Sequence, residues 1–136
     1  MDKKYDGKIE VYQYAISDET IEGYVEAYSS NNGLGSKVIF KQNDDLKKCV
    51  CVKIDDFIKE KYDFLKADIE SFEYRMLLGA EKSIRKYTPK LAICIYHNAV
   101  DFVTIPLLIK KINPVYNLKI RHHLGDLSDT VLYAYV

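Results

Sequence analysis

Proline, glycine and net charge are all scarce in this 136-residue chain, which has three prolines, six glycines and 20 basic residues balanced by 20 acidic ones. So little glycine and proline excludes a collagen-like or low-complexity sequence. The balanced charge argues against nucleic acid as a partner, because binding to phosphates needs an excess of positive charge. Hydrophobic residues make up 48% of the chain, which excludes a disordered segment and favours a single domain over residues 1–136.

Long hydrophobic runs are missing as well. The first residues, MDKKYDGK, lack the apolar core of a secretory signal, and the apolar stretch 102–109 is interrupted by Thr104 and Pro106. A bilayer span needs roughly 20 apolar residues. We therefore expect no membrane span and a cytoplasmic protein.

Cysteine is also sparse, and its odd count of three excludes a disulfide framework. Cys49 and Cys51 lie in an apparent strand, CVCVKI, where residues two apart point to the same face. No second cysteine pair is present to complete a metal site. We interpret the cysteines as small apolar residues of a reduced protein and assign no metal site.

The first half of the chain has the alternation of apolar and polar residues that is typical of strands. We expect strands over 8–16, 24–28, 37–40 and 49–53. Gly33-Leu34-Gly35 lies between the second and third of these, which favours a hairpin turn. A glycine-rich cofactor loop is the alternative, but the third glycine and a following helix are missing. Asp55 is expected to cap a short helix over 56–62.

In the second half, strands alternate with helices. We expect strands over 62–67, 91–96, 116–123 and 130–136, and helices over 71–87 and 104–112. In the first helix the apolar residues recur every three to four positions, and Glu73 is assigned to the polar face. This alternation predicts an α/β fold with a mostly parallel sheet. The last two strands are joined by a short loop, so they form an antiparallel pair.

Ionisable side chains follow two of these strands, at the edge of the sheet where α/β proteins bind ligands. Asp68 and Glu70 can hold a substrate hydroxyl, act as a base or bind a cation. The alternative is that Asp68 caps a turn and that Glu70 only favours the start of a helix. His97 follows the next strand, where a neutral imidazole suits removal of a proton from an alcohol or is simply structural.

A third place is the pair His122 and His123, beside Arg121. Adjacent residues of a strand face opposite ways, so these histidines do not readily share a metal ion. One of them can face the site, and we assign the pair to substrate binding. The sequence has no motif of a P-loop or of a serine nucleophile, which argues against kinases and hydrolases.

The segment FLKADIESFEY at 64–74, followed by LLGA at 77–80, resembles F-I-K-I-D-V-E-G-A-E-Y and L-K-G-A, the central motif of the FkbM-type methyltransferases. Other segments that resemble the family follow its order: YAISD at 14–18, IDDFI at 54–58, PKLAI at 89–93, YH at 96–97, IP at 105–106, RHH at 121–123 and TVLYA at 130–134. The matches cover nearly the whole chain, and together they are specific.

The resemblance implies a class I, Rossmann-like methyltransferase fold that transfers a methyl group from S-adenosylmethionine. The expected acceptor is a hydroxyl of a sugar or small metabolite, and the enzyme positions both reactants and removes a proton. By resemblance, Asp68, Glu70 and His97 are catalytic residues at the acceptor site. Ser17 and Asp18 would lie towards the adenine of the cofactor.

Two departures from the family pattern matter. Ser71 replaces the glycine of the motif, which would tighten the approach of the backbone. The family's glycine-rich loop and the acidic residue after its second strand are absent, so the chain resembles the C-terminal part of a methyltransferase. Three hypotheses stay open: an active domain, a non-catalytic remnant or interaction module, and a subunit whose partner supplies the cofactor loop.

The missing strands would also leave the strand that ends at Ala67 with an unpaired edge. We expect this edge to be covered in one of three ways. The early strands of the chain pair with it, a second copy of the chain forms a homo-oligomer through it, or another protein supplies the strands.

Overall fold

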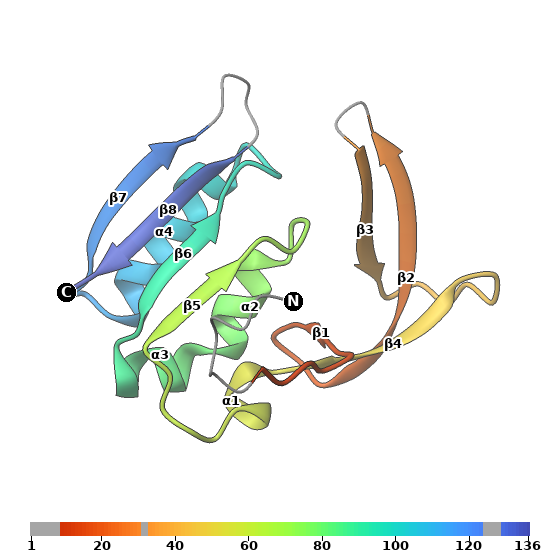
Figure 1. The fold of residues 1–136 in the computed structure, drawn as a ribbon, viewed down its shortest axis with the longest axis horizontal. Coiled ribbons are helices and arrows are strands. Elements are labelled where there is room, and N and C mark those ends of the chain that lie inside the picture. Colours follow the sequence, from red (N-terminus) through yellow and green to blue (C-terminus); the bar gives the residue numbers. More distant parts are fainter. Residues whose placement is uncertain (1–8, 31–32, 124–128) are drawn as a thin grey trace.

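The computed structural model describes residues 9–30, 33–123 and 129–136, and these form two four-stranded sheets with helices (Figure 1). In chain order the elements are β1 (Ala15–Ile16), β2 (Ile21–Ser30), β3 (Gly33–Ile39), β4 (Lys47–Val52), α1 (Ile54–Phe57), β5 (Phe64–Ala67), α2 (Glu73–Gly79), α3 (Glu81–Tyr87), β6 (Lys90–Cys94), α4 (Asp101–Ile112), β7 (Asn117–His122) and β8 (Thr130–Tyr135). The predicted alternation of strands and helices in the second half is confirmed.

The first sheet has the strand order β1-β4-β2-β3. β2 and β3 pair antiparallel, which confirms the predicted hairpin. Gly33-Leu34-Gly35, predicted to lie in its turn, instead belongs to β3, where Gly33 pairs with Ser30 and Gly35 with Tyr28. The long strand predicted over 8–16 is wrong in extent, because only Ala15–Ile16 pairs with a neighbour, in parallel with β4. Alternation alone does not make a strand where no partner strand lies alongside.

The second sheet has the order β5-β6-β8-β7, and it corrects the expectation of a mostly parallel sheet. Only β5 and β6 pair in parallel, whereas β8 runs antiparallel to both β6 and β7. The helices between β5 and β6 form the crossover that a parallel pair requires. β8 follows β7 through a short connection and inserts between β7 and β6, so the predicted antiparallel pair at the C-terminus is confirmed.

The helix predicted over 71–87 is divided into α2 and α3 at Ala80. Gly79 lies so close to the segment after β1 that a Cβ atom there would be 2.1 Å from the carbonyl oxygen of Ser17. α4 begins at Asp101, three residues earlier than predicted, so Pro106 lies in its second turn. The exposed side of the helix tolerates this proline, since Phe102, four residues earlier, is 41% exposed.

The helix predicted over 56–62 is wrong in extent, because α1 covers only Ile54–Phe57. Its predicted cap is wrong as well, because Asp55 lies inside α1 and does not cap it. The Asp55 carboxylate instead accepts hydrogen bonds from the backbone N–H groups of Lys82 and Ser83, at 2.8 and 2.9 Å, and from the Ser83 hydroxyl. These donors belong to the first turn of α3, whose own N-cap residue, Ala80, has no side-chain acceptor. Asp55 therefore caps a helix that begins 26 residues after it.

The main core lies between the second sheet and the helices that cover one of its faces (Figure 1). Its fully buried members include Ile93 and Ile95 of the central strand and its extension, and Ile105 and Ile109 of α4. The run LAICIY was predicted to be buried on both faces, and all the residues of Leu91–Ile95 are buried. No helix of the described residues is long and apolar enough to cross a membrane.

β5 ends the strand order of its sheet, as expected for an unpaired edge. The early strands do not cover it, because within the described residues they form the separate first sheet. Phe64, at the start of β5, is 57% exposed. Pairing with a second copy of the chain or with another protein stays a prediction.

Candidate active site

The predicted catalytic residues lie together where β5 and β6 end. Register pairs Ala67 with Ile93, so the loops after both strands begin side by side. Asp68 follows β5 directly, and His97 stands three residues beyond β6. The loop that carries Glu70 turns through two left-handed residues, Glu70 with φ 55° and Ser71 with φ 77°. This explains a glycine in the corresponding place of the family motif, because a side chain is strained in that conformation.

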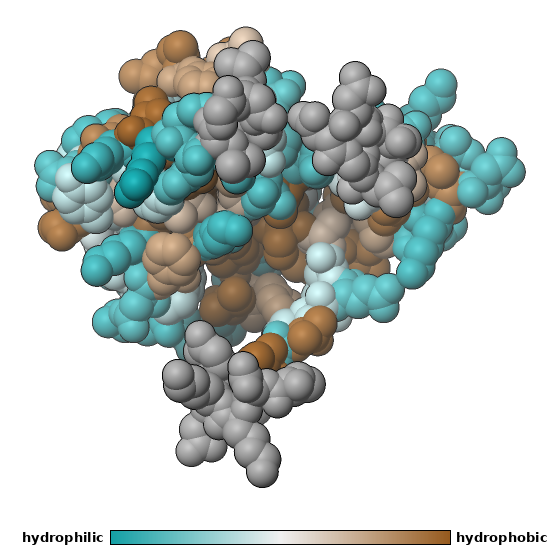
Figure 2. Space-filling view, turned by 45° about the horizontal axis from the view of Figure 1, so that its top comes forward, coloured by the Kyte–Doolittle hydropathy of each residue, from teal (hydrophilic) through white to brown (hydrophobic). Residues whose placement is uncertain are grey.

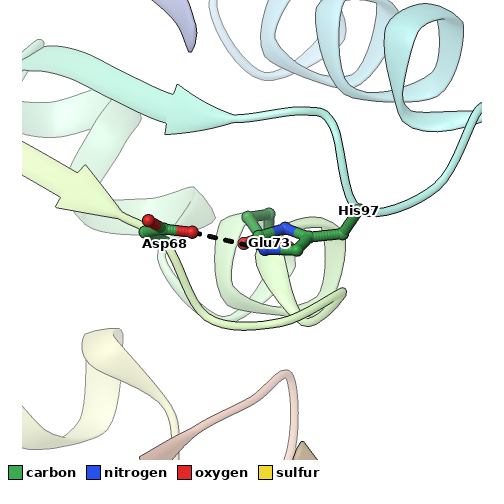
Figure 3. A group of neighbouring side chains, drawn as sticks. All are labelled: Asp68, Glu73 and His97. Atoms are coloured by element: carbon green, nitrogen blue, oxygen red, sulfur yellow. Dashed lines mark ion pairs between the residues drawn. The ribbon is translucent and has the colours of Figure 1, made fainter. Parts of the chain in front are cut away.

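The imidazole of His97 is surrounded by carboxylates (Figure 3). Its Nε2 lies 3.3 Å from Oδ1 of Asp68 and 3.6 Å from Oε2 of Glu70. The hydroxyl of Tyr96 donates a hydrogen bond of 3.1 Å to the same Asp68 oxygen. The His97 side chain is only 7% exposed, whereas those of Asp68 and Glu70 are 37% and 35% exposed. The two carboxylates therefore face the solvent, and the imidazole lies behind them.

Glu73 belongs to this cluster, and its assignment to the polar face of the helix was wrong. Its side chain is completely buried, with Oε1 accepting the Ile69 N–H at 2.8 Å and lying 3.2 Å from Nδ1 of His97. The spacing contained a signal for this, since Glu73 stands three and four residues before the buried Met76 and Leu77. A carboxylate on the apolar side of a helix needs a buried partner.

Burial and charge oppose each other in this cluster. Burial disfavours the imidazolium, but Glu73, Glu70 and Asp68 outweigh it and raise the pKa of His97. Burial would likewise raise the pKa of Glu73, but His97 and the Ile69 N–H hold that pKa below its usual value. Burial, with Asp68 second, raises the pKa of Tyr96. Tyr96 thus stays protonated as a donor to Asp68.

Several polar atoms of the cluster are nevertheless left without a hydrogen bond. Within the described residues, Oε2 of Glu73 and both ring nitrogens of His97 are buried and lack a partner in hydrogen-bonding geometry. The contacts between the ring and the carboxylates are thus charge contacts at short distance rather than well-formed hydrogen bonds. Such atoms are rare in folded proteins, and a catalytic role or a bound water or ion is a usual explanation for them.

A pocket of about 430 Å³ opens beside the cluster. It is lined by residues of the first sheet and of the segment between β5 and α2, among them Ile16, Lys37, Asp68, Glu70 and Phe72. Figure 2 shows that the molecule is hollowed between its two halves and that hydrophobic residues lie in the hollow. A larger pocket of about 570 Å³ lies against β2, β3 and β4, but no cluster of ionisable groups comparable to that around His97 lines it. The smaller pocket is therefore the better candidate for a substrate.

Ser17 and Asp18, predicted to contact the cofactor, do not line this pocket. Ser17 is completely buried and donates its hydroxyl to Asp18 at 3.0 Å. Asp18 in turn forms an ion pair of 3.1 Å with Arg75. These residues hold the end of β1 against α2, and their place near the adenine of the cofactor stays a prediction.

His122 and His123, predicted to bind substrate, are not brought to the cluster either. β7 lies at the far edge of its sheet, separated from β6 by β8. Nδ1 of His122 is 2.8 Å from the hydroxyl of Thr130, and Nε2 of His123 is 2.9 Å from that of Tyr133. Both hydrogen bonds join β7 and its extension to β8. Their role in substrate binding stays a prediction.

Comparisons with known proteins found a matching family model and a similar solved structure. A family model described as the methyltransferase FkbM domain matches residues 3–126. A crystal structure of Methyltransferase FkbM from Methylobacillus flagellatus KT is similar, with a TM-score of 0.73 and 32% sequence identity. The match covers 93% of this chain and 28% of that chain, so this chain spans less than a third of its structural relative. No curated protein matches the chain significantly.

Proposed function

Since the chain belongs to the FkbM methyltransferase domain family, we propose that it serves the transfer of a methyl group from S-adenosylmethionine to a hydroxyl of a sugar or other small metabolite. The observation that carries this proposal is the His97 cluster at the ends of β5 and β6, where Asp68 and Glu70 face a pocket of suitable size.

In the proposed site, the acceptor hydroxyl donates a hydrogen bond to Asp68 or Glu70, the two accessible carboxylates. Its proton then moves to a carboxylate or, when the ring is neutral, to Nε2 of His97, which lies 3.3 and 3.6 Å from them. The buried Glu73 holds the other ring nitrogen and balances the positive charge that the ring gains. Positioning of the acceptor oxygen supplies much of such a rate enhancement.

In this chain the residues predicted to lie near the cofactor have partners within the protein. Ser17 and Asp18 are engaged with each other and with Arg75. The chain also spans only 28% of the similar methyltransferase. These two observations favour, as a second candidate, a subunit whose cofactor contacts come from another polypeptide segment or from a second copy of the chain.

Calorimetric titration with S-adenosylhomocysteine tests the first candidate, after the mass of the chain in solution has been measured. Binding at micromolar concentration would support a complete cofactor site and justify a search for the acceptor with labelled S-adenosylmethionine. In that assay Asp68→Asn should retain cofactor binding and lose methyl transfer, whereas Asp56→Asn, on the exposed side of α1, should retain both. A folded chain that binds nothing at about 1 mM ligand would reject the complete site and leave the partner-dependent candidate.

A further inference from the structure

We propose that Asp68, Glu73 and His97 bind a divalent metal ion. One oxygen of each carboxylate and one ring nitrogen of His97 all lie within 4.8 Å of one another. In the structure Nε2 of His97 is 3.3 Å from Asp68, and Nδ1 is 3.2 Å from Glu73. Two ligands of one ion, each about 2.1 Å from it, lie roughly 3.0–4.2 Å apart. The ion would take one of the two ring nitrogens, and the carboxylate beside the other nitrogen would have to rotate toward it.

The unpartnered atoms of the cluster are the second observation that points to an ion. Oε2 of Glu73 belongs to a completely buried side chain and lacks a hydrogen bond within the described residues, as do both ring nitrogens of His97. The Glu73 oxygen and, in a neutral ring, the one His97 nitrogen that carries no proton each offer a lone pair to a metal ion. Figure 3 shows the three side chains close together, Asp68 just after β5, Glu73 at the start of α2 and His97 in the loop after β6.

The charge of the cluster also favours a cation. Asp68, Glu70 and Glu73 place three carboxylates around one imidazole, so a protonated ring would neutralise only one of them. Among the described residues, no lysine or arginine forms an ion pair with Asp68 or Glu73. A divalent ion bound by Asp68, Glu73 and a neutral His97 would balance the charges of the two carboxylates that bind it. Glu70, with Oε2 3.6 Å from Nε2, lies at the open side of the site.

The donor set indicates which ion to expect. One imidazole with two carboxylates suits a first-row divalent ion such as Mn²⁺ or Zn²⁺, whereas Ca²⁺ prefers a site of oxygens alone. Three protein ligands leave coordination positions open, and Asp68 lines the pocket from which an oxygen ligand would enter. If the proposed methyl transfer is correct, the ion would make a coordinated hydroxyl more acidic. His97 would then be a ligand, and Glu70 the group that takes the proton.

The test begins with chain freed of metal by a chelator and titrated with Mn²⁺ alone, the free ion being measured by electron paramagnetic resonance. We expect one site per chain, and a Zn²⁺ titration should displace the bound Mn²⁺. Asp68→Asn and Glu73→Gln should weaken binding about 10-fold or more, whereas the control Asp56→Asn should not change it. A folded wild-type chain without saturable binding up to about 1 mM Mn²⁺ or Zn²⁺ would overturn the proposal.

A second measurement avoids variants that fail to fold. The chain has three histidines, so the ring signals of His97, His122 and His123 can be followed together by NMR. Substoichiometric Mn²⁺ should broaden the signals of His97 before those of the other two. Equal broadening of all three, or earlier broadening of His122 and His123, would contradict the site. Titration with S-adenosylhomocysteine is independent of both measurements, so a failure of the proposed function and a failure of the metal site can be told apart.

Discussion

Replacing Asp55 by alanine should destabilise the protein through a helix that is distant in sequence. The substitution removes the acceptor of two backbone N–H groups, those of Lys82 and Ser83, at 2.8 and 2.9 Å. The Ser83 hydroxyl loses one partner but keeps the carbonyl oxygen of Ala80 and the Tyr62 hydroxyl. The damage is therefore concentrated in the two N–H groups at the start of α3.

The expected magnitude follows from the burial of this cap. Loss of a helix cap costs about 0.5–2 kcal/mol, and Ser83 is only 6% exposed, so water cannot readily replace the carboxylate. We expect a loss of about 2 kcal/mol in the free energy of unfolding. For a domain of this size that corresponds to a decrease of roughly 6–10 °C in Tm.

Urea unfolding followed by circular dichroism measures the effect, and Asp56→Ala is the matched control. Asp56 stands beside Asp55 in the same helix, but its side chain is exposed and has no hydrogen bond among the described residues. The control should change stability by less than about 0.5 kcal/mol. If Asp55→Ala is equally mild, or if both variants lose the same stability, the cap between α1 and α3 is refuted.

Four further predictions concern packing, strain, pH and association. Gly79→Ala should lower the free energy of unfolding by about 3 kcal/mol or more, because the added Cβ would lie 2.1 Å from the Ser17 carbonyl oxygen. A urea unfolding curve equal to that of wild type would contradict this contact. Ser71→Gly should raise the free energy of unfolding by about 0.5–1 kcal/mol, because glycine adopts the left-handed conformation at φ 77° without the strain that serine has there. A lower free energy of unfolding in urea would show that this strain is absent. Burial raises the pKa of Cys51 to about 11 and of Cys94 to about 12, so both thiols stay protonated in the folded chain at a pH where the thiols of the unfolded chain ionise. The free energy of unfolding should therefore fall as the pH rises from about 9 through these values. Iodoacetamide at about pH 9 should label both cysteines only when the chain unfolds, and mass spectrometry can determine this. The free edge of β5 should make the chain associate with concentration, and a strictly monomeric mass by light scattering would exclude pairing between copies.

Much of the local structure could be predicted from the sequence because it depends on local periodicity. Alternation found the β2–β3 hairpin, and the apolar run at 91–95 was correctly assigned to a buried strand. The rule that ligands bind beyond the ends of strands selected Asp68, Glu70 and His97, which the structure brings within 3.6 Å. These features require only knowledge of where each strand stops.

Other features depended on partners that are remote in the sequence. The partner of Glu73 is His97, 24 residues later, and the helical spacing showed which side Glu73 faces without showing what would compensate its charge. The strand order of the second sheet could not be predicted either. The position of β8 between β6 and β7 depends on which strand edges are still unpaired when β8 joins the sheet. Ser17 and Asp18 match a family motif, yet their side chains are engaged at the contact between β1 and α2.

The sequence by itself thus determined the family and the alternation of strands and helices in the second half, because periodicity and motifs are properties of neighbouring residues. Only the tertiary structure decided which charges meet. The burial of Glu73 against His97, and the meeting of three carboxylates around one ring, arise when β5, α2 and the end of β6 pack together and exclude water from the ring. That exclusion, which no single segment can produce, turns ordinary acidic residues into a candidate catalytic and metal-binding site.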